Sequence, residues 1–305
     1  MSEKKCPNIG GQAVIEGVMM RAPGSLAVAV RKGDGSIVVR REKIKIDHSS
    51  LFKKPFLRGL VGLYDSLVLG IKALNFSAEQ ADIEGDNKPV TKKETILSII
   101  LGLGIGIALF LFLPLFVTNL MKNVFPLIED SFLVFNAVDG IIRMILFVLY
   151  LFIISRFKDI QRVFQYHGAE HKSIFAHEKG LDLTVENARN MSRFHPRCGT
   201  SFLLIVMLVS IVVFSLIPKE SAFIIKFGSR IVFLPVIAGV SYEILKLSGR
   251  HFNNPLVKML VAPGLWLQKL TTREPDDTQI EVAIASIRVA LSEEATEEEG
   301  LIYVR

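Results

Sequence analysis

The stretch TILSIILGLGIGIALFLFLPLFVTNL, residues Thr95 to Leu120, contains no charged side chain. A helix needs about 20 consecutive apolar residues to cross the hydrocarbon core of a membrane, and this stretch exceeds that length. Three further segments are apolar over a comparable length: Phe132–Ser155, Ser201–Ile217 and Ala222–Leu247. Together they predict an α-helical polytopic membrane protein with four transmembrane helices in two hairpins.

The composition of the whole chain supports this class. The chain has 305 residues, of which 50% are hydrophobic and 22% are charged. It is too apolar for an ordinary soluble domain, yet its charged share requires that a substantial part lies in water. Its two cysteines, Cys6 and Cys198, provide no disulfide framework, which fits a reducing compartment.

The distribution of Lys and Arg predicts the orientation. The segment Arg156–Arg197 carries eight of these residues, whereas Met121–Ser131 and Pro218–Ser221 carry one each. Because positively charged loops stay in the cytoplasm, we expect the central segment and both termini to be cytoplasmic. The first residues, MSEKKCPNIGG, lack the apolar core of a secretory signal, so we expect the first long apolar segment to direct membrane insertion.

The N-terminal part predicts a small β-rich cytoplasmic domain. Apolar and polar residues alternate on both sides of a Gly-Asp-Gly turn within Ser25–Ile44, which is typical of a β-hairpin. The preceding stretch GGQAVIEGVMMRAPG adds either a further strand or a loop. Pro55–Leu74 has the periodicity of an amphipathic helix, which lies either on the bilayer or against the β domain. Glu79–Lys93 is polar and is predicted to be a linker.

The C-terminal part predicts an interfacial segment, interrupted by Pro255 and the Pro263-Gly264 pair, followed by an amphipathic tail helix within Asp277–Glu298 that docks on its own protein. The expected units are a β-rich domain at 1–54, an amphipathic helix and linker at 55–93, a first transmembrane hairpin at 94–155, a cytoplasmic His-rich loop at 156–200, a second hairpin at 201–247, and the interfacial segment with its tail helix at 248–305.

A dense cluster of His and Glu follows the second apolar segment, in YHGAEHKSIFAHE, Tyr166–Glu178. His167, Glu170 and His171 are spaced i, i+3 and i+4, so on a helix they share one face. Two imidazole ligands and a carboxylate that activates water require that arrangement, and H-x-x-E-H is the order of the inverted zincin signature. The alternative is that both histidines are interfacial polar residues that bond carbonyl groups or lipid phosphates.

Two imidazoles do not hold a metal ion, so a third ligand is needed. Cys198 and His195, in FHPRCGTSF, precede the third apolar segment, and Glu243, in GVSYEILK, lies near the cytoplasmic end of the fourth. The predicted topology brings all of them to the same membrane boundary. Cys198 and Glu243 are the preferred ligands, followed by His195, with His177 and His251 as weaker candidates.

Other roles are open for several of these side chains. Glu243 is also placed to pair with Lys246 or Arg250, and Cys198 has the size of an ordinary buried residue. Asp139 and Arg143 stand one helical turn apart within an apolar segment, so they are expected to neutralise each other or to pair with Arg230.

The motifs GGQAVIEGVMMR, YHGAEHKSIFAHE, FHPRCGTSF and GVSYEILK, in this order, resemble the YqhQ-type bacterial membrane family over nearly the whole chain. The resemblance implies a bacterial cytoplasmic membrane protein with a domain of unknown function, commonly described as a predicted metal-dependent enzyme. It adds Gln12, Glu16 and Arg21 to the candidate functional surface.

Two functions remain as hypotheses. In the first, a divalent ion, with zinc as the favoured metal, is held by His167, His171 and Cys198 or Glu243, and Glu170 acts as the base of a hydrolase for a peptide or a lipid-linked ester. In the non-catalytic form of this hypothesis, the metal ion is structural and fixes the central loop to the two hairpins. In the second, a non-enzymatic factor docks on another membrane complex or the ribosome. Attraction to anionic lipid headgroups explains the basic charge equally well, and we find no nucleic-acid-binding motif.

Overall fold

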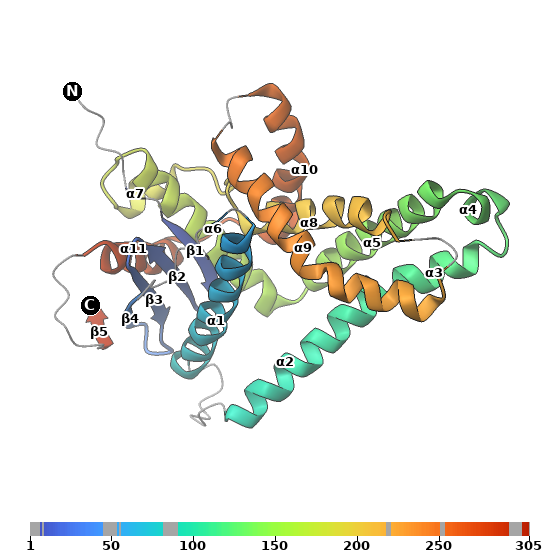
Figure 1. Cartoon of the computed structure of the whole chain (residues 1–305). Coiled ribbons are helices and arrows are strands. Elements are labelled where there is room, and N and C mark those ends of the chain that lie inside the picture. The colour runs from blue at the N-terminus through green and yellow to red at the C-terminus, as the bar shows by residue number, and fades with distance from the viewer. Residues whose placement is uncertain are drawn as a thin grey trace.

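The computed structural model describes residues 7, 9–44, 54, 56–81, 91–217, 221–250, 254–292 and 301–304. Four N-terminal strands and one C-terminal strand form an antiparallel sheet in the order β1-β2-β3-β4-β5 (Figure 1). The predicted hairpin is present, with Arg31 opposite Ile37 across a turn in which Gly35 has φ of 85°. The stretch before it contributes two further strands. The strands are β1 Gly10–Val14, β2 Gly17–Ala22, β3 Ser25–Arg31, β4 Ile37–Lys43 and β5 Leu301–Val304.

Helices cover both faces of this sheet. On one face lie α6 (Lys158–Glu178) and α11 (Asp277–Leu291), and on the other lies α1 (Leu57–Gln80). Strand β3 is buried on both sides because its alternate residues enter two cores: Ala27 and Ala29 face the α6 and α11 side, whereas Val28 faces the α1 side. We call this unit, β1–β5 with α1, α6 and α11, the sheet domain.

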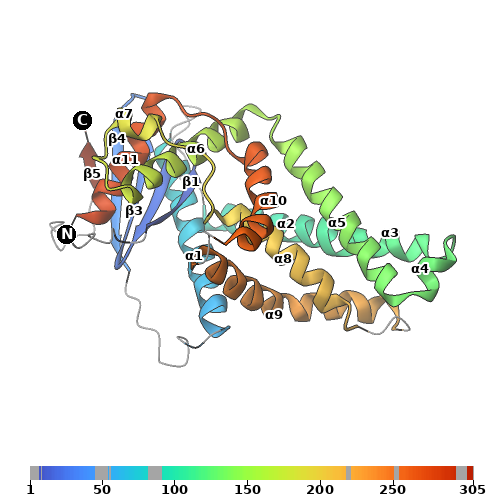
Figure 2. The same ribbon diagram turned by 90° about the horizontal axis from the view of Figure 1, so that it is seen from above.

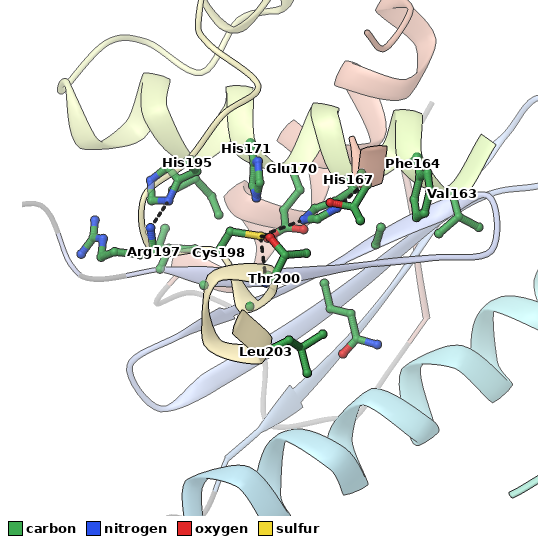
Figure 3. A pocket seen from close by; sticks show the side chains of 18 residues that line it. Val163, Phe164, His167, Glu170, His171, His195, Arg197, Cys198, Thr200 and Leu203 are labelled. Atoms are coloured by element: carbon green, nitrogen blue, oxygen red, sulfur yellow. Dashed lines mark hydrogen bonds between the residues drawn. The ribbon is translucent and has the colours of Figure 1, made fainter. Parts of the chain in front are cut away.

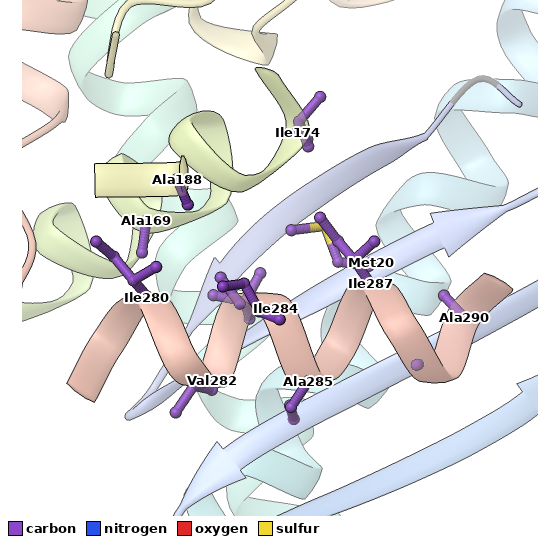
Figure 4. Close-up of a cluster of buried hydrophobic side chains, with 14 of the residues drawn as sticks. Met20, Ala169, Ile174, Ala188, Ile280, Val282, Ile284, Ala285, Ile287 and Ala290 are labelled. Atoms are coloured by element: carbon purple, nitrogen blue, oxygen red, sulfur yellow. The ribbon is translucent and has the colours of Figure 1, made fainter. Parts of the chain in front are cut away.

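The tail helix docks on its own protein, as its amphipathic pattern predicts. Ile280, Ile284 and Ile287 of α11 lie against Met20 of β2 and Ala169 of α6 in one buried cluster (Figure 4). The segment expected as a His-rich loop is largely helical, because it contains α6 and the short α7 (Val185–Arg189). Three distant parts of the chain therefore form one core around α6.

Helix α1 joins the sheet domain to the apolar helices. Ala73 and Phe76, near its C-terminal end, are buried against the sheet. Near its N-terminal end, a Cβ on Gly59 would stand 2.9 Å from Tyr242 Cβ in α9 (Phe223–Arg250), so the two helices touch closely there. The interpretation of α1 as a helix packed on the β domain holds for this part, although Tyr64 and other large apolar side chains remain exposed.

The remaining helices extend from one end of the sheet domain (Figures 1 and 2). Three stretches are long and apolar enough to cross a membrane: Lys93–Met121, Leu133–Ile154 and Phe223–Leu247. The first comprises α2 (Lys92–Ile107), the π-helical turn η2 (Ala108–Phe112) and α3 (Leu113–Met121), and the second lies in α5 (Phe132–Ile154). The short α4 (Pro126–Asp130) links the two stretches.

The four-helix topology is not confirmed, because the third predicted segment forms a shorter helix, α8 (Gly199–Phe214). Sixteen residues at about 1.5 Å each fall short of a hydrocarbon core about 30 Å thick. The expected interfacial segment is a helix as well, α10 (Pro255–Thr271), with Pro263 inside it. It approaches α8 so closely that a Cβ on Gly264 would stand 2.6 Å from Ser201 Oγ.

A buried ion-pair network ties α5 to α8 and α9. Asp139 accepts a 2.6 Å hydrogen bond from Arg143 and a 2.7 Å bond from Arg230, and Arg143 also donates to Ser210 Oγ at 2.6 Å. Both predicted pairings of Asp139 are therefore present at once. Buried charges of this kind need partners, and here one carboxylate serves two guanidinium groups.

Candidate metal centre

Helix α6 presents His167, Glu170 and His171 to a cavity of about 490 Å³ (Figure 3). The i, i+4 spacing brings the two imidazole rings together edge to face, with their centroids 4.4 Å apart. On its other side α6 is anchored to the sheet domain by Ala169 and Ala176. The two histidines are therefore placed by a helix whose opposite side is fixed in a core.

Hydrogen bonds fix the tautomer of both histidines. His167 Nδ1 lies 2.8 Å from the carbonyl oxygen of Thr271, and His171 Nδ1 lies 2.6 Å from that of Arg193. Because a carbonyl oxygen can only accept, each Nδ1 must carry the proton. Burial lowers the pKa of His171, so its ring is neutral at pH 7. In the neutral form of either ring, Nε2 offers a lone pair to a ligand, as in metal sites where a carbonyl orients the imidazole.

The sulfur of Cys198 lies close to the Nε2 atoms of both histidines. Its Sγ lies 3.3 Å from His167 Nε2, and the ligand atoms of the three residues lie within 4.8 Å of one another. Cys198 is also the N-cap of α8, where Thr200 donates to the sulfur from its backbone N–H at 3.5 Å and from its hydroxyl at 3.3 Å. The sulfur is therefore held at the N-terminus of α8, close to the two imidazoles.

The donor set fits a divalent cation better than it fits three hydrogen-bonding side chains. Two imidazole lone pairs point at one thiol, which has a single proton to share between them. A cation satisfies all three groups at once. Two imidazole nitrogens and one thiolate are ligands that zinc accepts, and three protein ligands are the number found in catalytic zinc sites.

Glu170 lies in the same cavity and is 5% exposed. Burial raises the pKa of its carboxyl to about 7. Within the described part of the chain no hydrogen bond reaches this carboxylate. Strand β1 passes directly beside it, since a Cβ on Gly11 would stand 2.8 Å from Glu170 Oε1. The GGQAVIEGVMMR motif therefore borders the site, and its second glycine leaves room for the carboxylate.

Two contacts position the backbone around the ligands. The side chain of Gln268, in α10, bonds both the N–H and the C=O of His195 at 2.8 Å, which fixes the loop before Cys198. Gly168 lets the chain after α10 cross α6, because a Cβ there would stand 2.1 Å from the Arg273 carbonyl oxygen. The crossing brings the Thr271 carbonyl to His167. Sequence patterns reveal neither carbonyl partner, although the glycine inside HGAEH was a possible signal of this crossing.

Among the described residues, the other candidate ligands do not join these three. Glu243 binds Arg58 through both carboxylate oxygens and accepts a 3.2 Å bond from the Phe56 N–H. His195 is adjacent, with its ring centroid 5.6 Å from that of His171, but its Nε2 faces Glu178 at 3.4 Å. His177 Nε2 lies 3.1 Å from the Pro7 carbonyl oxygen, and His251 lies outside the described residues.

The three candidates from the N-terminal motif take different positions. Gln12 lines the cavity, and its side chain also lies against α1 at Gly70. Glu16, which has φ of 49° in the turn after β1, binds Arg162 and accepts a 3.2 Å bond from the Tyr166 hydroxyl, so it fastens that turn to α6. Arg21 lies in β2, opposite Gly10 and Leu26, and is not among the residues that line the cavity.

Comparisons with known proteins agree on one family. The family model described as "Protein of unknown function (DUF1385)" matches residues 54–293. The chain is 38% identical to the "Uncharacterized protein YqhQ" of Bacillus subtilis (strain 168), over 98% of both chains. No solved structure matches the chain significantly. The chain therefore belongs to the DUF1385 family, as its resemblance to YqhQ-type proteins predicts.

Proposed function

We propose that this protein is a metal-dependent hydrolase of the bacterial cytoplasmic membrane, with its site at the cytoplasmic boundary. The observation that carries the proposal is the convergence of three ligand atoms, from His167, His171 and Cys198, beside a buried glutamate. The positive charge of the central segment supports the orientation, in which both termini are cytoplasmic.

The ligand set favours zinc and a catalytic site over a structural one. A divalent ion held there supplies Lewis acidity at the cavity wall. In the described part of the chain, no fourth His, Cys, Asp or Glu joins the three ligands. A structural site closes all four positions with protein ligands, whereas a catalytic site leaves one open.

Glu170 is the proposed general base. It stands between the two histidines in the sequence, lies in the same cavity and makes no hydrogen bond to another described residue that would hold it elsewhere. Its carboxylate is therefore available to take a proton from water and to return it to a leaving group. The proposed roles are those of the inverted H-x-x-E-H signature.

The cavity suggests a substrate that is partly apolar. Val163, Phe164 and Leu203 line it together with the glycines of β1. A peptide or a lipid-linked ester meets this requirement, and a site beside apolar helices favours substrates that are held at the membrane.

The test compares three variants of the full-length protein. His167→Ala should lose the bound metal, Glu170→Gln should keep it but lose turnover, and His177→Ala, a control on the same helix, should keep both. Metal is measured by mass spectrometry of the purified protein. Turnover is measured as peptide or lipid products released from membranes of cells that lack the protein. If no product depends on Glu170 and metal content does not depend on His167, the hydrolase is refuted and docking on a membrane complex or the ribosome is favoured.

A further inference from the structure

A second cavity, of about 490 Å³, lies where α5 ends and the chain after α10 begins. Four cationic side chains from different segments line it: Arg156 after α5, Arg193 before Cys198, Lys269 in α10, and Arg273. Glu274 is the one acidic residue in the lining. The cavity shares no lining residue with the candidate metal centre.

The charge of this cavity is strongly positive. Glu274 is already bound by the buried Lys172, and its other oxygen lies 3.8 Å from Arg193 Nε. Arg193 and Arg273 donate to carbonyl oxygens, those of Thr272 and Ser155, which orient the guanidinium groups without neutralising them. Among the described residues, no carboxylate forms an ion pair with Arg156, Lys269 or Arg273. Three of the four converging cations therefore have no counter-charge among the described residues, which makes the cavity a site for an anion, and guanidinium groups match phosphate oxygens.

An apolar groove continues from this cavity along α5. It also has a volume of about 490 Å³, and its lining is almost entirely apolar. Phe152 belongs to both cavities, and the guanidinium of Arg156 lies over its ring at 4.3 Å from the centroid. The groove runs along a helix that is long and apolar enough to cross a membrane. Its lining residues are Ile141, Met144, Ile145, Val148, Leu149 and Phe152.

We propose that the two cavities together bind one membrane phospholipid with an anionic headgroup. The phosphate lies among Arg156, Arg193, Lys269 and Arg273, and an acyl chain lies in the groove beyond Phe152. A polar cationic end joined to an apolar groove matches the two ends of such a lipid. Neither end involves a metal ligand. Because the backbone carbonyl of Arg193 lies 2.6 Å from His171 Nδ1, the test leaves Arg193 unchanged.

The test uses native mass spectrometry of the full-length protein in detergent, with equal amounts of phosphatidylglycerol and phosphatidylcholine that have identical acyl chains. We expect one phosphatidylglycerol to be retained in preference to phosphatidylcholine. The variant Arg156→Gln/Lys269→Gln removes two charges without removing a side-chain hydrogen bond to a described residue. Its preference should fall by about 25-fold, taking roughly fivefold for each of the two cations near an anionic lipid. The control Lys179→Gln/Lys258→Gln removes the same charge from exposed positions and should keep the preference.

Two further arms distinguish the lipid from a free anion. Glycerol phosphate at the same concentration should not displace phosphatidylglycerol, because it has no chain for the groove. Ile145→Trp, which fills the groove, should reduce lipid retention while leaving the four cations in place. Equal retention of both lipids, an unchanged preference in the Arg156→Gln/Lys269→Gln variant, displacement by glycerol phosphate, or full retention by Ile145→Trp would each overturn the proposal.

Discussion

Replacing Gly168 by alanine should weaken metal binding without unfolding the sheet domain. The new Cβ would stand 2.1 Å from the carbonyl oxygen of Arg273, and ordinary contacts begin at 3.4 Å. The crossing segment must therefore move by about 1.3 Å, because a backbone carbonyl in a close-packed interior has no side chain to rotate away. Thr271, the last residue of α10, stands two residues before Arg273, and its carbonyl accepts the 2.8 Å bond from His167 Nδ1.

A displacement of that size takes the bond beyond hydrogen-bonding distance, since such bonds weaken above about 3.2 Å. Loss of a carbonyl that orients a metal-binding imidazole costs about 10-fold to 100-fold in metal affinity. Stability changes less. Alanine gains about 1 kcal/mol over glycine in a helix, which offsets part of the roughly 1–3 kcal/mol that overpacking costs.

The assay is competition for zinc between the purified variant and a chelator of known affinity, with helix content followed by circular dichroism. Gly62→Ala is the control, because its Cβ would find its nearest atom at 3.8 Å. It should keep both metal affinity and helix content. Wild-type zinc affinity in Gly168→Ala would refute the reasoning that the chain after α10 holds His167 in its ligating orientation.

Three other substitutions each remove a specific hydrogen bond or ion pair. Gln268→Leu leaves the buried N–H of His195 without a partner and removes one of the two hydrogen bonds to its C=O, which keeps the bond from the Cys198 N–H. It should lower the free energy of unfolding by about 1–3 kcal/mol, seen as a lower melting temperature; an unchanged value would contradict the bonds. Asp139→Asn removes the carboxylate between two buried guanidinium groups and should cost about 3–5 kcal/mol, whereas the exposed control Asp182→Asn should cost less than about 0.5 kcal/mol. Glu243→Gln should leave the metal content unchanged, because that carboxylate binds an arginine of α1, and loss of metal would place it in the site after all.

Local patterns predicted the parts of the site that a single helix determines. The spacing of His167, Glu170 and His171 places them on one face wherever α6 lies, because helical periodicity is a local property. The amphipathic tail helix and the β-hairpin were predictable for the same reason. Cys198 emerged as a ligand candidate because it precedes an apolar segment on the same side as α6.

Contacts between distant segments were not predictable in this way. Glu243 was a plausible ligand by topology, but Arg58, far away in the sequence, binds it. The carbonyl groups of Thr271 and Arg193 leave no trace in the sequence, because every residue has one. Pairing of β5 with β4 likewise depends on a long-range register. The predicted count of four transmembrane helices is not confirmed, because an apolar composition does not fix where a helix ends, and α8 is shorter than the three long apolar stretches.

X-ray absorption at the zinc edge of the zinc-loaded full-length protein tests the central claim most directly. It reports the ligand atoms themselves, and a Cys6→Ser background leaves Cys198 as the one cysteine in the chain. The account predicts one sulfur at about 2.3 Å and two imidazole nitrogens at about 2.0–2.1 Å, with the sulfur signal lost in Cys198→Ser. A protein that binds no zinc, or a spectrum without sulfur in the Cys6→Ser background, would contradict it.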